Sequence, residues 1–196
     1  MLPNCYVRAD TGHYVPGCAP WRGCRSTQVT LGSKRMPQYR EATKDDLPAI
    51  CMLGEEVNEL HHIAWPHIFA PIGQPLRDME HWSQSVEHEN ATTFVAVEAG
   101  TIAGFVTVGV VTEIHSLLQP LRYARVGSVG VTASLRGQGI GTKLMALAEK
   151  WARERGGLDL RLHVFAFNEH ALQMYKELGY EVLSHSMAKR LSPNRA

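Results

Sequence analysis

The feature that most constrains this chain is a glycine-rich turn that joins a strand-like segment to an amphipathic helix. The segment 122–131 is largely apolar, and Gly137, Gly139 and Gly141 follow it closely. After the turn, apolar residues recur at helical spacing as far as Trp151. The first backbone N–H groups of a helix have no partner within the helix, and the helix dipole adds partial positive charge there. The turn therefore predicts a binding site for a phosphate or pyrophosphate.

Two common phosphate-binding motifs do not fit this turn. A P-loop needs a lysine directly after its last glycine, but Thr142 separates Gly141 from Lys143. The dinucleotide fingerprint needs the spacing G-x-G-x-x-G, whereas this turn has G-x-G-x-G. An ordinary surface turn is the other alternative, and the strand before the turn and the strong helix after it argue against that interpretation.

The remaining patterns predict an α/β fold of the α+β type, in which helices cover both faces of a mixed sheet. A turn at 98–100 favours an antiparallel hairpin, and Asn168 is a suitable N-cap for a short helix that ends at Gly179. The expected strands are 37–43, 93–97, 102–114, 122–131, 160–164 and 180–191, and the expected helices are 45–61, 75–90, about 140–155 and 169–178.

Residues 1–36 differ in composition from the rest of the chain. Glycine and proline interrupt every period in this stretch, which holds five basic residues and one acidic residue. We expect an N-terminal extension that is disordered or non-native, followed by a single domain over residues 37–196. His13, Cys18 and Cys24 lie in the extension, but their spacing fits no common zinc module, so we expect no metal.

The overall charge bears on the kind of partner. Lysine and arginine number 20, and aspartate and glutamate number 19, which gives a formal net charge of +1. Such a chain has no uniform field to attract nucleic acid or an anionic membrane. No apolar run approaches the roughly 20 residues of a membrane span, and the N-terminus lacks the apolar core of a signal peptide. We therefore expect a cytoplasmic protein with no nucleic-acid or membrane partner.

Two motifs in the second half of the chain resemble those of a known family. The stretch 136–141 (RGQGIG) matches the [RQ]-x-x-G-x-[GA] acyl-CoA motif of the GNAT superfamily of N-acyltransferases. Downstream, Asn168, Ala171, Tyr175 and the pair 179–180 are similar to the N-x-x-A-x-x-x-Y-x-x-x-G-[FY] segment of that superfamily. The expected order of elements also resembles the GNAT fold, in which the sheet splays at its centre.

The resemblance implies an acetyl-CoA-dependent N-acetyltransferase with an amine acceptor. It places Tyr175 near the sulfur as the acid that protonates the departing thiolate, a role that a tyrosine hydroxyl can fill. A packed core aromatic remains the alternative for Tyr175, and a helix cap remains the alternative for Asn168. The residues that the resemblance places against acetyl-CoA are Val129, Gly130, Val131, Arg136, Gly137, Gln138, Gly139, Ile140, Gly141, Thr142, Asn168 and Tyr175.

The general base is where this chain departs from the family pattern. Many relatives carry an acidic residue near the end of the central strand, but Gly127 and Ser128 occupy the matching positions here. Gly127 and Gly130 could instead widen the acceptor pocket. A neutral imidazole is a suitable base or water relay. The stretch 61–71 also resembles an H-x(4)-P-x-x-F segment that often borders the acceptor site, with a packed loop as the alternative. The candidates for base or acceptor pocket are His163, Glu113, His61, Trp65 and Phe69.

Acceptor identity stays open at this stage. A small amine, attacking the thioester directly in a ternary complex, is the favoured acceptor. A protein or peptide amine is the second enzymatic alternative, and a catalytically inactive CoA-binding sensor is the alternative outside enzymes. Analogy with the family also favours a homodimer in which the final strand, with Leu183 and Met187, pairs across an axis.

Overall fold

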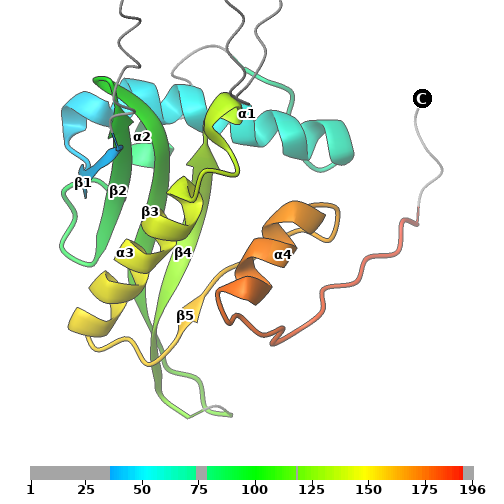
Figure 1. Ribbon diagram of the computed structural model, residues 1–196. Coiled ribbons are helices and arrows are strands. Elements are labelled where there is room, and N and C mark those ends of the chain that lie inside the picture. Colours follow the sequence, from blue (N-terminus) through cyan, green and yellow to red (C-terminus); the bar gives the residue numbers. More distant parts are fainter. Residues whose placement is uncertain (1–35, 74–78, 118, 192–196) are drawn as a thin grey trace, which may run out of the picture. The chain divides into compact units, whose positions relative to one another are not determined.

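The computed structural model describes residues 36–73, 79–117 and 119–191 (Figure 1). Within these ranges the strands are β1 (Gln38–Glu41), β2 (Ala91–Glu98), β3 (Thr101–Glu113), β4 (Leu121–Val131) and β5 (Leu160–Arg161). They form one sheet in the order β1-β2-β3-β4-β5. β1 to β4 run antiparallel to their neighbours, whereas β5 pairs parallel to β4. The predicted mixed sheet is confirmed.

Four helices accompany the sheet in the described ranges. They are α1 (Leu47–Ala64), α2 (Met79–Ser83), α3 (Ile140–Glu154) and α4 (Glu169–Glu177), with 3-10 turns at Lys44–Asp46 and Ala133–Leu135. The chain enters α1 through a capping turn, in which the Thr43 N–H donates to Asp46 Oδ2 at 2.8 Å. None of the described helices is both long enough and apolar enough to cross a membrane.

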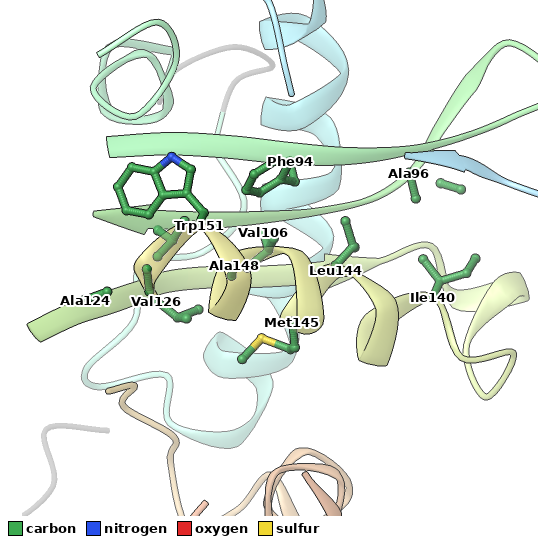
Figure 2. Close-up of a cluster of buried hydrophobic side chains, with 13 residues drawn as sticks. Phe94, Ala96, Val106, Ala124, Val126, Ile140, Leu144, Met145, Ala148 and Trp151 are labelled. Atoms are coloured by element: carbon green, nitrogen blue, oxygen red, sulfur yellow. The ribbon is translucent and has the colours of Figure 1, made fainter. Parts of the chain in front are cut away.

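One face of the sheet packs against α3, as Figure 2 shows. Leu144, Ala148 and Trp151 are buried at helical spacing on α3, and they meet Val106 and Val126 of the sheet. Each fully buried large apolar side chain contributes roughly 1.5–3 kcal/mol relative to exposure. The amphipathic pattern predicted from the sequence is therefore the pattern that attaches α3 to the sheet.

The opposite face packs against α1 and α2. Successive side chains of a strand point to opposite faces, so Phe105 belongs to this second cluster while Val106 belongs to the first. Ile50 of α1 is fully buried here. A Cβ at Gly54 of α1 would lie 2.5 Å from the Trp82 ring of α2, so only a glycine allows these two helices to approach so closely.

The sheet splays between β4 and β5. The parallel pairing consists of two residue pairs, Ala124 with Leu160 and Arg125 with Arg161. Beyond Arg125 the β5 side of β4 has no strand partner among the described residues. The strand expected over 160–164 is accordingly shorter, because the chain diverges from β4 after Arg161.

The helix expected over 75–90 is wrong in its extent. Residues 74–78 lie outside the described part of the chain, and α2 ends at Ser83. The Ser83 hydroxyl donates to the Glu80 carbonyl at 2.7 Å, a local bond that competes with helix continuation. Further on, Glu87 has a positive φ of 55°, which no α-helix contains.

The final strand expected over 180–191 is also wrong. This segment has no regular secondary structure, and its large apolar side chains are exposed, namely Val182, Leu183, Met187 and Leu191. An apolar segment forms a strand only against an available edge, and β5 offers two paired residues. The homodimer expected through this strand stays a prediction. The N-terminal extension, with His13, Cys18 and Cys24, lies almost wholly outside the described residues.

Candidate active site

A cavity of about 1250 Å³ lies where β4 separates from β5. Residues far apart in the sequence line it. They come from the second half of β4, from the turn and first residues of α3, from α1 and α2, and from the segment 162–177. Because β4 has no β5 partner beyond Arg125, main-chain groups of 126–131 are left to pair with an extended ligand. Val129, Gly130 and Val131 all line the cavity.

The glycine-rich turn lines one part of this cavity, and we call it the anion cradle after the phosphate site that the sequence predicts there. Gly137 and Gly139 have φ values of 74° and 80°, in the left-handed region that glycine tolerates. A Cβ at either position would meet nothing within 4 Å, so the space beside the backbone is open. Gly139 is the N-cap of α3, and no described side chain caps this helix. The first N–H groups of α3, with Gly141 and Thr142 in the lining, therefore lie at the cavity, where the helix dipole favours negative charge.

Arg136 connects the anion cradle to the end of β4 through a hydrogen bond. Its Nε donates to the Val131 carbonyl oxygen at 2.9 Å, although the arginine side chain is largely at the surface. A hydrogen bond from a charged donor to a carbonyl is among the stronger ones. Arg136 therefore links the turn to the end of β4, besides lining the cavity.

A β-bulge lies at Gly127 and Ser128, where the family resemblance led us to expect an acidic residue. The register between β3 and β4 shifts between Val106 and Val108, so that Gly127 and Ser128 lie opposite Thr107. The Ser128 N–H donates to Thr107 Oγ1 at 2.9 Å. A Cβ at Gly127 would lie 2.7 Å from that oxygen. Position 127 thus has no room for a carboxylate while Thr107 is present.

Gly130, three residues further along β4, also allows neighbouring side chains to pack against the strand. A Cβ there would lie 2.7 Å from the Phe105 ring and 3.1 Å from Val57. The glycines of β4 therefore permit close packing of neighbours, and Thr107, Phe105 and Val57 fill the space that was expected to widen the acceptor pocket. Thr107 was missed from the sequence, because this bulge brings it to Ser128, which is 21 positions further along the chain, and so leaves no local signal.

Tyr175 and Asn168 reach the cavity from α4 and its N-terminus. Both line the cavity. Burial raises the pKa of the Tyr175 hydroxyl above its ordinary value, so the group is protonated at neutral pH. The Tyr180 ring meets the Tyr175 ring edge-on, with centroids 5.6 Å apart. Asn168 Oδ1 accepts the Ala171 N–H at 3.1 Å and so caps α4. The cap leaves the Asn168 amide N–H groups for another partner.

His61 is the candidate base whose tautomer the structure defines. Its Nδ1 lies 2.7 Å from the Val57 carbonyl oxygen. A carbonyl oxygen can only accept, so Nδ1 carries the proton in the neutral ring and Nε2 carries the lone pair. His61 lines the cavity. His163 also lines it, and its ring meets Phe165 edge-on at 5.2 Å.

The other sequence candidates lie in different places. Glu113 pairs with Leu121 at the opposite end of β4 from Val129, and it is not part of the cavity lining. Trp65 contacts Phe165 and Phe167 but does not line the cavity. Gln138 also lies outside the lining, and its Nε2 approaches the Ser134 carbonyl at 3.5 Å.

An aromatic wall closes the side of the cavity next to α1. We define this wall as four of the cavity-lining rings, those of His61, Phe69, His163 and Phe165. Their contacts bring the end of α1 and the turn after it against the segment that follows β5. Phe165 was missed from the sequence, although the alternation of Phe165 and Phe167 directly before Asn168 is a signal that could have found it.

Comparison with known proteins places these features in a family. The model of the Acetyltransferase (GNAT) family matches residues 55–180, which is more than half of the chain. The chain belongs to this family. The matched range contains both GNAT motifs, at 136–141 and 168–180, as well as the aromatic wall. The GNAT fold predicted from the sequence is thereby confirmed.

Individual relatives match parts of the chain. The uncharacterised N-acetyltransferase YdgE of Bacillus subtilis (strain 168) is 36% identical over 74 residues, which are 38% of this chain and 47% of YdgE. The streptothricin acetyltransferase of Streptomyces lavendulae is 36% identical over 95 residues, which are 48% of this chain and 47% of that protein. This GNAT chain thus spans about half the length of the curated relatives it matches.

Solved structures share the fold over a longer range. A mutant BH1408 protein from Bacillus halodurans has a TM-score of 0.75 at 23% identity, covering 79% of this chain and 99% of that one. The acetyltransferase AAC(6')-Iy, solved with the bisubstrate analogue CoA-S-monomethyl-acetylneamine, has a TM-score of 0.57 at 18% identity, covering 81% of this chain and 100% of that one. These likenesses show the GNAT fold alone.

Proposed function

We propose that this GNAT protein transfers the acetyl group of acetyl-CoA to a small-molecule amine. One observation carries the proposal: a single cavity joins the anion cradle, the unpaired edge of β4 and the side chain of Tyr175. An acyl-CoA needs all three, because it presents a pyrophosphate, an arm with amide groups and a thiolate leaving group. The CoA analogue bound by AAC(6')-Iy supports this assignment.

Different residues of this chain would bind successive parts of acetyl-CoA. Main-chain N–H groups between Gly137 and Thr142 would hold the pyrophosphate, where the helix dipole favours negative charge. The edge of β4 over 129–131 would pair with the amides of the pantetheine arm. Asn168 would donate its amide N–H to the same arm, since its Oδ1 is occupied by the cap of α4.

The reaction then needs one proton removed and one supplied. A neutral amine nitrogen forms a bond to the acetyl carbonyl carbon, and the carbon–sulfur bond breaks. The nitrogen loses a proton to His61 Nε2, while the sulfur leaves with the proton of the Tyr175 hydroxyl. Tyr175 regains its proton from His61 through solvent, so the products are the acetylated amine and the free thiol. A main-chain N–H at the edge of β4 would stabilise the charge that develops on the carbonyl oxygen.

A thiol-release assay with acetyl-CoA and an amine panel tests the proposal. We expect turnover by the wild type, and a kcat lowered by about 10²–10⁴-fold in Tyr175→Phe, the range for a lost general acid. Tyr180→Phe is the matched control, because Tyr180 contacts the Tyr175 ring but does not line the cavity. We expect Tyr180→Phe to turn over at close to the wild-type rate.

Calorimetry with CoA separates the alternatives. CoA binding without turnover of any small amine or short peptide would favour the catalytically inactive sensor. Turnover confined to peptides would favour the protein acceptor. A chain that does not bind CoA would overturn the assignment of the anion cradle.

A further inference from the structure

The aromatic wall bears directly on the acceptor. The centroid of the Phe165 ring lies 5.0 Å from that of Phe69, 5.5 Å from that of His61 and 5.2 Å from that of His163, in tilted or edge-on contacts. The two phenylalanine side chains are half-buried, so parts of their surfaces remain exposed at the cavity. An exposed cluster of rings gains the most from a ligand that presents its own flat apolar surface.

Two further rings, which lie outside the cavity lining, pack against the wall. Trp65 and Phe167 do not line the cavity, yet each contacts Phe165, with centroids 5.3 Å and 6.1 Å away. Phe165 is therefore held on two sides. A ring fixed in this way loses little conformational freedom when a ligand packs on it, which favours binding.

Charge in the cavity is unfavourable for a polycation. Among the described lining residues, one carboxylate is present, that of Glu177 at the end of α4. Its Oε1 already accepts from Gln173 Nε2 at 2.9 Å. The same lining contains the Arg136 guanidinium and four histidines. A ligand with several ammonium groups would enter such a cavity with few groups to pair them, and unpaired charge is costly away from water.

We infer that the acceptor is a monoamine with an aromatic body that packs on the wall formed by His61, Phe69, His163 and Phe165. This inference rests on the proposed function, because it names the acceptor of that same reaction. It predicts that compounds with many ammonium groups, such as polyamines and aminoglycosides, are poor acceptors for this chain. The wall also brings the acceptor beside His61 Nε2, the proposed proton acceptor.

A panel of four amines tests the inference at saturating acetyl-CoA. The probes are 2-phenylethylamine, propylamine, spermidine and kanamycin, and the readout is kcat/KM from thiol release. We expect 2-phenylethylamine to exceed propylamine by at least about tenfold, the discrimination that an apolar pocket gives for a missing apolar group. We expect spermidine and kanamycin to be the poorest acceptors.

A matched pair of variants locates the effect in the wall. Phe165→Leu should raise the KM for 2-phenylethylamine about tenfold and leave the KM for acetyl-CoA unchanged. Phe167→Leu, which alters the same cluster outside the cavity, removes only support for Phe165 and should raise the KM for 2-phenylethylamine by about twofold to threefold, again with the KM for acetyl-CoA unchanged. Equal effects of the two variants would overturn the role of the wall, and if Phe165→Leu does not fold, the wild-type panel decides alone.

The failure of the inference and that of the proposed function look different. Efficient acetylation of spermidine or kanamycin, with 2-phenylethylamine poor, overturns the aromatic acceptor and leaves the acetyltransferase standing. CoA binding by calorimetry without acetylation of any probe or other amine overturns the proposed function and the inference together.

Discussion

At the scale of single residues, the close approach of Thr107 requires a glycine at position 127. The Thr107 hydroxyl lies in the bulge and accepts the Ser128 N–H, and a Cβ at position 127 would approach it to 2.7 Å. Because Thr107 is buried in the sheet, it cannot easily move away. Position 127 therefore has no room for the carboxylate that the family resemblance would place there, and the proposed proton acceptor, His61, lies on another element.

Gly127→Ala should lower the free energy of unfolding by about 1–3 kcal/mol, the usual effect of overpacking a rigid site. Gly109→Ala is the matched control, because Gly109 also lies in a central strand but its added Cβ would meet Ala91 at an ordinary 3.4 Å. Urea denaturation measures both. If the two variants were equally stable, the close approach of Thr107 would not be a constraint.

His61 is the residue on which the proposed proton removal depends. His61→Asn keeps a donor for the Val57 carbonyl but removes the Nε2 lone pair, so kcat should fall by about 10²–10⁴-fold with the KM for acetyl-CoA unchanged. His62→Asn is the control, since His62 Nδ1 approaches the Phe69 carbonyl at 2.7 Å and the residue does not line the cavity. An unaltered kcat in His61→Asn would transfer the role to His163 or to solvent.

At the scale of elements, an ion pair joins β1 to the start of α1. Arg40 contacts Asp46 through two hydrogen bonds, at 2.6 Å and 2.8 Å, and Asp46 also accepts the Thr43 N–H. The Arg40 hydrogen bond lowers the pKa of Asp46 from 3.8 to about 2, helped by the bond from Thr43. The carboxylate is thus more acidic in the folded chain than in the unfolded one.

The stability of the fold should depend on pH through this pair. Since the folded pKa lies below the unfolded one, the stabilisation is present above about pH 4 and is lost as the pH falls toward 2. Asp46→Asn should cost about 1–2 kcal/mol at pH 7 and should flatten the loss of stability between pH 4 and 2. The exposed Asp45→Asn is the control. Urea denaturation at several pH values gives both curves, and a parallel loss in Asp46→Asn and wild type would assign the acid sensitivity elsewhere.

Elements whose partners lie close by were easier to predict from the sequence than elements that need a distant edge. α3 carries its own amphipathic pattern, and its expected range agrees with Ile140–Glu154. The segment 180–191 alternates less clearly, and whether it pairs depends on how far β5 stays beside β4. A sequence pattern states that a segment can be a strand, but not that an edge is free for it.

At the scale of the whole described fold, the site combines local and distant contributions. The positions of the cradle and of Tyr175 at the cavity could be anticipated from the sequence, the cradle from its glycines between a strand and a helix, and Tyr175 from a segment that resembles a GNAT motif. Phe165 and the bulge could not, although His61, Phe69 and His163 of the aromatic wall were candidates, because these contacts arise where α1, β3 and the segment after β5 meet. Which residues share a cavity is therefore set by the splay of the sheet, and the acceptor side of the site depends on that splay more than on any motif.

Ligand binding couples the cradle to the stability of the fold. A ligand that binds the folded chain alone stabilises it by about 2.7 kcal/mol at a concentration 100 times its Kd. CoA should therefore raise the Tm of the wild type, as measured by thermal unfolding. Gly139→Ala should abolish most of this increase, because its Cβ would project into the open space of the cradle.

Gly179→Ala separates this effect from backbone strain. Gly139 and Gly179 have similar φ values, 80° and 86°, and a Cβ at either meets nothing within 4 Å. Each substitution should cost about 1–2 kcal/mol, since alanine is strained in the left-handed region. Gly179 does not line the cavity, so Gly179→Ala should lower the Tm without CoA and keep the increase on adding it. If Gly139→Ala also kept the full increase, the pyrophosphate would lie elsewhere, and the cradle would be a turn that only connects β4 to α3.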